Sequence, residues 1–85
     1  MHDQQPAIDL ERNQPDRNMA RFYSLAVESD LFGTILARRR WGRIGTVGRA
    51  LCIAHPTAEE AWLEVRSLER AKRRRGYVDR PAVTT

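Results

Sequence analysis

A tryptophan, a glycine and an arginine stand together at positions 41–43, and further arginines surround them. The surrounding arginines are Arg38, Arg39, Arg40 and Arg49. The flat indole ring of Trp41 can stack on a base or a sugar, and the guanidinium of Arg43 offers a planar fork of donors to a phosphate. The grouping therefore predicts a site that grips the sugar-phosphate end of a nucleic acid.

Trp41 and Arg43 each have a structural alternative. Trp41 could be a core aromatic side chain at the end of a strand, although its direct neighbours are Arg40 and Gly42 rather than apolar residues. Arg43, placed by this interpretation in a turn between glycines, could be a surface charge or an ion-pair partner of Glu64, which would contribute little to stability. The basic surroundings favour the binding role for Trp41.

Glycines recur at every third position in Gly42, Gly45 and Gly48. A glycine-rich loop can cradle a phosphate, but this one lacks the lysine and the Ser/Thr of a P-loop and does not lead directly into a helix. We therefore expect a tight turn that needs positive φ angles, with backbone N–H groups left free for an anion.

A second basic group lies at positions 72–75, as Lys72, Arg73, Arg74 and Arg75. Three roles are open to it: capping the C-terminal end of a helix, tracking the phosphates of a nucleic acid, or binding an anionic membrane surface. The membrane role ranks last because the apolar stripe of this helix is needed against a sheet.

Charge is distributed unevenly along the 85 residues. The net charge is +4, but residues 1–34 hold three arginines and six acids, for −3, whereas residues 35–85 hold twelve cations and five acids, for +7. Fourteen of the fifteen cationic residues are arginine, the residue suited to bidentate phosphate contacts. The basic half points to an anionic partner, with nucleic acid first.

Nothing in the sequence suits catalysis, a metal or a cofactor. His2 and His55 are the two histidines, and no spacing of Cys, His and Asp fits a metal site. Cys52, the single cysteine, is expected to be a small buried core residue. We therefore expect a non-enzymatic protein with no cofactor and no metal. No segment resembles a signal peptide or a membrane span, so the expected location is the cytoplasm, including the nucleoid.

The elements follow from hydrophobic periodicity. Alternation predicts strands over 19–27, 33–41 and 49–55. A capping box at Thr57 begins a helix that Gly76 ends, with Trp62 and Leu63 as the main contacts to the sheet. Residues 1–18 are expected to form an N-terminal extension, with a short edge strand over 7–11 and a turn over 13–16. Residues 19–78 form the predicted domain, and residues 79–85 form a C-terminal tail. The predicted fold is α+β: a twisted antiparallel sheet of about three to five strands with one long helix packed across one face.

From Arg21 to Tyr77 the chain resembles a WGR domain, in particular the small stand-alone bacterial type. The resemblance rests on Phe22-Tyr-Ser-Leu25, Arg40-Trp-Gly-Arg-Ile-Gly-Thr46, Thr57-Ala-Glu-Glu-Ala-Trp62 and Lys72-Arg-Arg-Arg-Gly-Tyr77. In poly(ADP-ribose) polymerases such a domain binds DNA at a break. The resemblance implies that Trp41 packs against the terminal sugar and that Arg43 holds DNA or a neighbouring domain. No ADP-ribosyl transfer is implied, since no catalytic domain is expected here.

The sequence therefore predicts a nucleic-acid-binding module that prefers DNA ends or nicks. The expected DNA-binding residues are Arg39, Arg40, Trp41, Gly42, Arg43, Arg49, Lys72, Arg73, Arg74 and Arg75. The alternative is a protein-interaction module that docks an acidic protein partner, because arginine and tryptophan also dominate protein interfaces.

Overall fold

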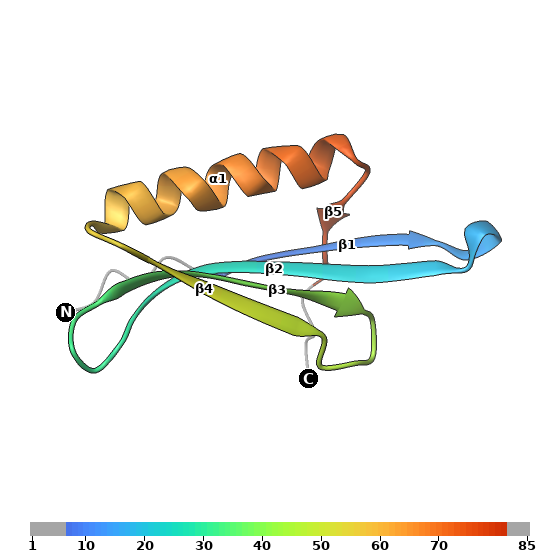
Figure 1. Cartoon of the computed structure of the whole chain (residues 1–85). Helices are drawn as coiled ribbons and strands as arrows, with labels where there is room; N and C mark the ends of the chain where they lie inside the picture. Colours follow the sequence, from blue (N-terminus) through green and yellow to red (C-terminus); the bar gives the residue numbers. More distant parts are fainter. Residues whose placement is uncertain (1–6, 82–85) are drawn as a thin grey trace.

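The computed structural model describes residues 7–81, which form one antiparallel sheet with a helix across one of its faces (Figure 1). The strand order is β4-β3-β2-β1-β5. The elements are β1 (Ile8–Gln14), the 3₁₀ turn η1 (Pro15–Arg17), β2 (Met19–Ser29), β3 (Ile35–Arg43), β4 (Arg49–His55), α1 (Ala58–Arg74) and β5 (Val78–Asp79). This arrangement confirms the predicted α+β fold.

Alternate side chains of the central strands form the core with α1. Tyr23 and Leu25 of β2 and Ala37 of β3 are buried together with Ala61 and Val65 of the helix. A period of two along each strand puts one set of side chains toward the helix and the other set on the opposite side. We call these the helix side and the open side of the sheet.

Helix α1 is capped at both ends by the residues that the sequence singles out. The hydroxyl of Thr57 accepts the N–H of Glu60 at 3.1 Å. At the other end Gly76 has a φ of +97°, and the N–H of Tyr77 donates to the carbonyl of Lys72 at 3.1 Å. This bond closes a Schellman motif, which directs the chain back to the sheet. Tyr77 is buried under the helix end.

The expectation that Leu63 packs on the sheet is wrong, because this side chain is 68% exposed. The buried stripe of the helix runs through Ala61 and Val65, and Leu63 stands two residues from each of them. Two residues correspond to about 200° around a helix of 3.6 residues per turn. Trp62, at the border of the stripe, is partly buried against the core.

The N-terminal strand is longer and better paired than the short edge strand expected over 7–11. β1 pairs with β2 from Ile8 to Gln14, and Leu10 and Glu11 also pair with β5. The expected turn over 13–16 is instead η1, which leads through Asn18 at a φ of +52° into β2. β5 includes Asp79, where the predicted tail begins. Residues 1–6, with His2, and 82–85 lie outside the described residues.

The expectation that Cys52 is a core residue is also wrong, since its side chain is exposed. Among the described strands β4 is the last of the sheet, and its partner there is β3. Cys52 lies opposite Arg38 in that pairing, so it shares the open side of the sheet, which the helix does not cover.

Two of the three glycines are packed against each other. A Cβ placed on Gly42 would lie 2.8 Å from the Cα of Gly48 and 3.5 Å from the ring of Phe22. Gly42 has no positive φ, so glycine is needed at this position because a side chain would not fit. Gly45 and Gly48 do have positive φ angles, of +95° and +75°, which confirms the tight turn expected between β3 and β4.

Replacing Gly42 with Ala should therefore lower the free energy of unfolding by about 1–3 kcal/mol, the usual cost of over-packing a filled site. Urea denaturation followed by circular dichroism measures the change. Ala50→Val is the control, because it adds carbon to an exposed position of β4 on the same open side. Equal midpoints for Gly42→Ala and the unchanged protein would show that the two backbones can separate without cost.

Candidate nucleic-acid interface

Three arginines lie side by side on three neighbouring strands. Arg12 of β1 is paired with Arg21 of β2, and Arg21 is paired with Arg43 of β3. We call these three residues the arginine row. Their alternation with core residues places them on the helix side of the sheet, near the C-terminal end of α1. Within residues 7–81 no carboxylate forms an ion pair with any of the three.

Like charges at directly opposite positions of a sheet repel each other. The Nε of Arg12 is buried without a hydrogen-bond partner in the described part of the chain, although a terminal nitrogen of the same side chain reaches Gln14 at 3.4 Å. Arg21 and Arg43 also border a shallow hollow of about 140 Å³ at the turn between β1 and β2. The row is therefore a place where an anion would relieve repulsion and supply missing acceptors.

Aromatic rings and cations alternate in the neighbouring rows. The ring of Trp41 stacks on Tyr23 with centroids 6.2 Å apart. The guanidinium of Arg39 lies 5.6 Å from the Trp41 centroid, and the ammonium of Lys72 lies 4.6 Å from the Tyr23 centroid. The Nε of Arg39 is buried without a hydrogen-bond partner in residues 7–81. Trp41 is only partly buried, so the ring belongs to the edge of the core and also borders the arginine row.

The placement of Arg43 in a turn between glycines is wrong. β3 continues through Arg43, and the N–H of Ile44 still donates to the carbonyl of Ala20 at 3.0 Å. The β2–β3 ladder therefore holds Arg43 in the row. The suggested ion pair with Glu64 is absent, because Glu64 is bonded to His55 instead.

The glycine turn uses some of its backbone N–H groups in its own hydrogen bonds. The carbonyl of Arg43 accepts both the N–H of Thr46 at 3.0 Å and its hydroxyl at 2.8 Å. With the N–H of Ile44 used in the ladder, two donors of the turn are occupied. Within residues 7–81 the N–H groups of Gly45, Val47 and Gly48 donate no hydrogen bond, so three donors of the turn stay unoccupied.

The basic residues at the helix end divide into two groups. Arg73 bonds Glu69 at 2.9 Å and Asp79 at 2.6 Å, and these bonds raise its pKa. Arg73 therefore ties the helix end to β5. The ammonium of Lys72 lies 4.6 Å from the ring centroid of Tyr23 and 5.6 Å from that of Tyr77, while Arg74 and Arg75 are exposed.

Lys72 has an unfavourable setting for a cation. Burial lowers the pKa of its ammonium below the ordinary value of 10.5, and the nearby charges of Arg75, Arg39 and Arg21 lower it further. A bound anion would offset the repulsion from these arginines, since its negative charge favours the charged form of Lys72.

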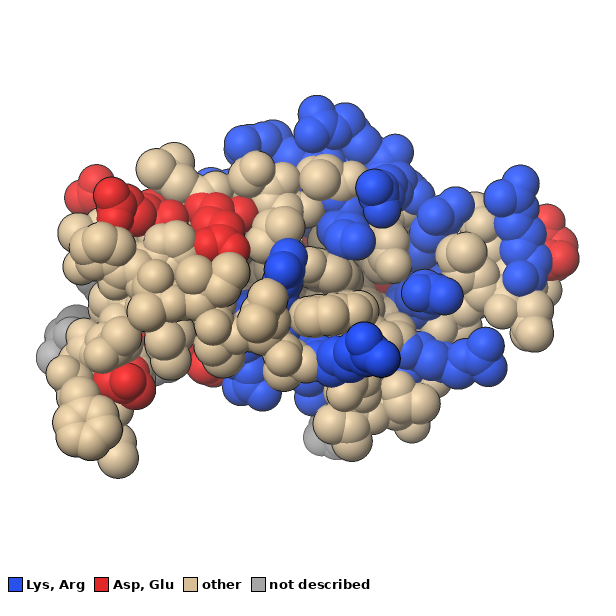
Figure 2. Space-filling view, viewed as in Figure 1, with Lys and Arg blue, Asp and Glu red and all other residues tan. Residues whose placement is uncertain are grey.

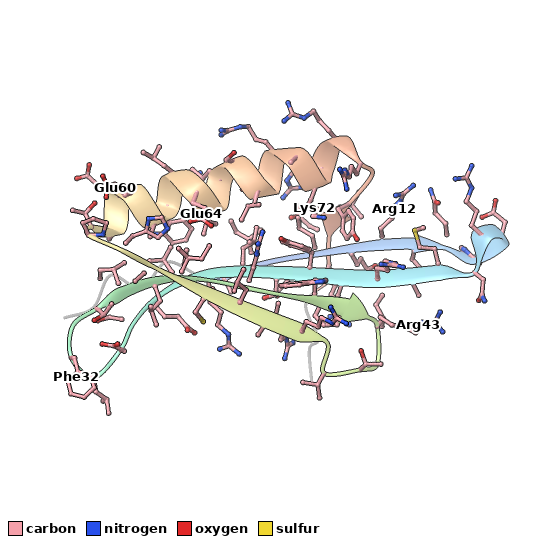
Figure 3. The ribbon with its side chains drawn as sticks, in the orientation of Figure 1. Arg12, Phe32, Arg43, Glu60, Glu64 and Lys72 are labelled. Carbon is pink, nitrogen blue, oxygen red and sulfur yellow. The ribbon has the colours of Figure 1, made fainter. Side chains whose placement is uncertain are left out.

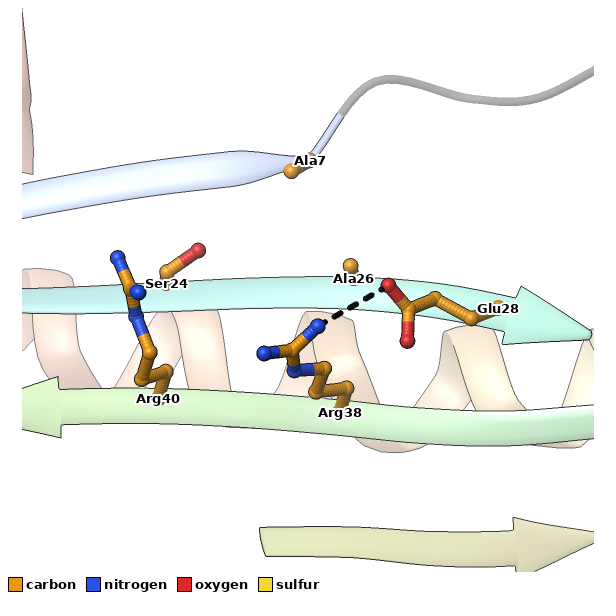
Figure 4. Close-up of a pocket in the computed structure, with 6 residues that line it drawn as sticks. All are labelled: Ala7, Ser24, Ala26, Glu28, Arg38 and Arg40. Atoms are coloured by element: carbon orange, nitrogen blue, oxygen red, sulfur yellow. Dashed lines mark hydrogen bonds and ion pairs between the residues drawn. The ribbon is translucent and has the colours of Figure 1, made fainter. Parts of the chain in front are cut away.

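Arg40 lies on the open side, away from this cluster. Its guanidinium is 5.1 Å from the ring centroid of Phe22. It lines a hollow of about 200 Å³ together with Ser24 and the ion pair between Arg38 and Glu28, which is 3.4 Å long (Figure 4). Arg39 and Arg40 therefore cannot contact the same ligand atom from one face of the sheet.

Basic and acidic side chains gather at opposite ends of the molecule. Lysine and arginine gather over the half that holds the C-terminal end of α1, and most acidic side chains on this face lie near its start (Figure 2). Figure 3 shows Arg12, Lys72 and Arg43 in the basic half, and Glu60, Glu64 and Phe32 in the other. We call the half with the C-terminal end of α1 the basic end. The arginine row lies on the sheet there, and Lys72 and Arg75 lie at the end of the helix.

Sequence reasoning missed Arg12 and Arg21. Arg21 stands two residues before Tyr23, so its face could have been deduced from the strand period. Arg12 could not, because the register of β1 against β2 is not encoded in either segment alone. Arg49 does share the site face, since it is paired with Trp41.

The described part of the chain has neither a membrane-spanning helix nor a metal cluster. No helix within residues 7–81 has both the length and the apolarity needed to cross a membrane. In the same range no group of three or more His, Cys, Asp or Glu side chains is arranged to hold a metal ion.

Removing one neighbouring charge should raise the pKa of Lys72. We expect Arg75→Gln to raise this pKa toward its ordinary value, because a repelling charge is lost. NMR titration of the Lys72 side chain measures the shift. Arg74→Gln is the matched control, since Arg74 is not among the groups that lower the pKa. Equal shifts in both variants would mean that the effect depends on net charge and not on the geometry of the basic end.

Comparison with known proteins gives one family match and one similar protein. The family model of the WGR domain matches residues 7–84. The uncharacterized protein y4dW of Sinorhizobium fredii (strain NBRC 101917 / NGR234) is 45% identical over 74 residues, which are 87% of this chain and 36% of the relative. The chain thus spans about a third of that relative's length. No solved structure matches. WGR is a binding domain, and neither match names an enzymatic activity. The chain belongs to the WGR domain family.

Proposed function

We propose that this chain is a nucleic-acid-binding module that holds DNA at an end or a nick. The observation that carries the proposal is the arginine row beside the Tyr23–Trp41 stack. Phosphates need cations that are not already neutralised, and exposed sugars or bases need an aromatic surface. The basic end offers both within neighbouring rows of one sheet face.

Membership of the WGR family supports the same proposal, because WGR domains of poly(ADP-ribose) polymerases bind DNA. By that analogy the partly exposed edge of Trp41 packs against a terminal sugar. Arg43, Arg21 and Arg12 take the phosphates near the end, and Lys72 and Arg75 hold the strand from above. Arg39 and Arg49 border this set, and Arg74 extends the charge. The proposed site does not include Arg40, which lies on the open side, or Arg73, which is bound to two carboxylates.

Phosphate contacts by the arginine row can be tested one charge at a time. With about four to five phosphates neutralised, log K should fall with log salt at a slope near −4. Arg21→Gln and Arg43→Gln should each weaken binding several-fold and reduce this slope by about 1. Fluorescence anisotropy with a labelled duplex at low and moderate salt measures both quantities.

The matched control for these variants is Arg38→Gln. It removes the same charge from β3, but from a side chain on the open side that is paired with Glu28. If Arg38→Gln weakens binding as much as Arg43→Gln, the protein responds to net charge alone and the proposed site is wrong.

End recognition depends on Trp41. A duplex with an open 5′-phosphorylated end should bind more tightly than one whose ends are closed by hairpins, and Trp41→Leu should abolish that difference. Leucine retains apolar volume against Tyr23 but cannot stack, so the variant keeps the packing better than alanine would. Circular dichroism checks the fold. Equal binding of both duplexes by the unchanged protein would reduce it to a general basic binder.

A protein-interaction role is favoured by a separate observation at the other end of the molecule. Leu31 is 99% exposed and Phe32 92% exposed at the β2–β3 turn. The carboxylate of Asp30 accepts the N–H groups of Phe32 at 2.8 Å and Thr34 at 2.9 Å. The turn is therefore ordered, and it presents two apolar side chains of the kind that anchor protein interfaces.

This second role makes a distinct prediction. A pull-down that survives nuclease treatment should lose its partner in Phe32→Ser but not in Arg43→Gln. Loss in Arg43→Gln alone would instead indicate an acidic partner at the basic end. If every captured protein is lost once nuclease has degraded the nucleic acid, the proposed protein-interaction role is wrong.

A further inference from the structure

Within residues 7–81 no strand or helix covers the outer edge of β4. In the order β4-β3-β2-β1-β5 it is an end strand, and it is seven residues long. The opposite edge is different, because β5 covers part of β1 there. Figure 1 shows no helix or strand of the described part of the chain beyond the outer edge of β4.

The backbone groups at this edge can be assigned from the ladder. The N–H of Ile44 donates to the carbonyl of Ala20, and in an antiparallel sheet bonded pairs alternate along each strand. Even-numbered residues of β3 thus bond β2, and odd-numbered ones bond β4. On β4 the residues bonded to β3 are Arg49, Leu51, Ile53 and His55. The N–H and C=O groups of Ala50, Cys52 and Ala54 consequently point outward.

The middle of this edge lacks the charges and prolines that usually prevent strand addition. Lysines, prolines and bulges protect natural edges, but Ala50-Leu-Cys-Ile-Ala54 contains neither charge nor proline. Leu51 is 40% exposed and Ile53 38% exposed. Helix α1 therefore leaves room beside them for the side chains of an added strand.

We propose that β4 pairs with β4 of a second copy of this chain. The two strands run antiparallel about a two-fold axis at Cys52, so that the two sheets join into one. Cys52 faces Cys52 of the second copy, Leu51 faces Ile53, and Ala50 faces Ala54. Apolar side chains of similar size meet on one side of the sheet and small side chains on the other, which is the self-complementarity that a two-fold interface requires.

Charge complementarity also favours a second copy over an unrelated strand. In this register Arg49 faces His55 of the second copy. His55 holds the carboxylate of Glu64 on the same side of the sheet. Within residues 7–81 Arg49 has no ion-pair partner. Pairing brings its guanidinium to a carboxylate twice, once in each half of the interface.

The dimer has a defined geometry. The axis is perpendicular to the sheet, so both helices lie on one side and the two basic ends point in opposite directions. The pairing uses the edge of β4 and does not depend on the proposed binding of DNA.

Disulfide cross-linking tests the register directly, with nucleic acid removed by nuclease beforehand. Directly opposite bonded residues have Cα atoms about 5.5 Å apart, within the range of a disulfide. In a Cys52→Ser background, Ala50→Cys mixed with Ala54→Cys should cross-link on oxidation. Either variant alone should react at least about tenfold more slowly, because its two cysteines lie about 13 Å apart along the strands.

Light scattering on a sizing column tests the assembly under reducing conditions. The unchanged protein should move from monomer to dimer as its concentration rises. Leu51→Lys should shift that transition to at least tenfold higher concentration, because it puts a charge on the paired edge. Leu31→Lys is the matched control, the same substitution at the fully exposed turn between β2 and β3, and it should leave the dimer unchanged.

Three results would overturn the proposal. The first is that the protein stays a monomer at every concentration. This result also overturns the proposal if the edge of β4 pairs with a strand of another protein. The second is cross-linking of the single variants as fast as of the mixture, which excludes the register. The third is a dimer that Leu51→Lys does not weaken although circular dichroism shows the variant folded.

Discussion

The ring of Tyr23 is the contact on which both the core and the basic end depend. It is 4% exposed, stacks on Trp41, meets the edge of Tyr77, and carries the ammonium of Lys72 on its surface. One side of this cluster continues into the aliphatic core, and the other continues into the arginine row. A change that moves the ring therefore changes folding and the charged surface together.

Within residues 7–81 the charges of the arginine row are held in place by backbone pairing and not by carboxylates. The registers of β1 with β2 and of β2 with β3 bring Arg12, Arg21 and Arg43 into one row. Acidic residues are available to the fold, but those at the helix end bind Arg73. Repulsion within the row opposes folding, and the hydrogen-bonded ladder offsets it. Such uncompensated charge is what a polyanion requires for tight, salt-sensitive binding.

The sequence allowed the sheet, the helix and both helix caps to be predicted, because each depends on residues close together in the chain. Alternation identified the faces of Tyr23 and Arg39, and Thr57 and Gly76 marked the helix ends. The errors concern pairings between distant segments. Arg43 was expected in a turn because glycines flank it, but the β2–β3 ladder includes Arg43, so this residue belongs to strand β3. The exposure of Cys52 depends on β4 being an end strand.

The same reasoning explains why the arginine row escaped detection. Its members are separated by 9 and 22 positions in the sequence, and only the order and register of three strands make them neighbours. Composition showed that arginine is abundant, but not which arginines share a face. Arg39 and Arg40 illustrate the difference, because they are adjacent in the chain and lie on opposite sides of the sheet.

Arg49 connects the two surfaces that we propose. On β4 it is paired with Trp41 of β3, so it borders the basic end. It also begins the uncovered edge, where a second copy would bring Glu64 to it. A guanidinium that binds a carboxylate is less available to a phosphate. Edge pairing would therefore confine the phosphate contacts to the arginine row and Lys72, and it would leave DNA binding in place while reducing the contribution of β4.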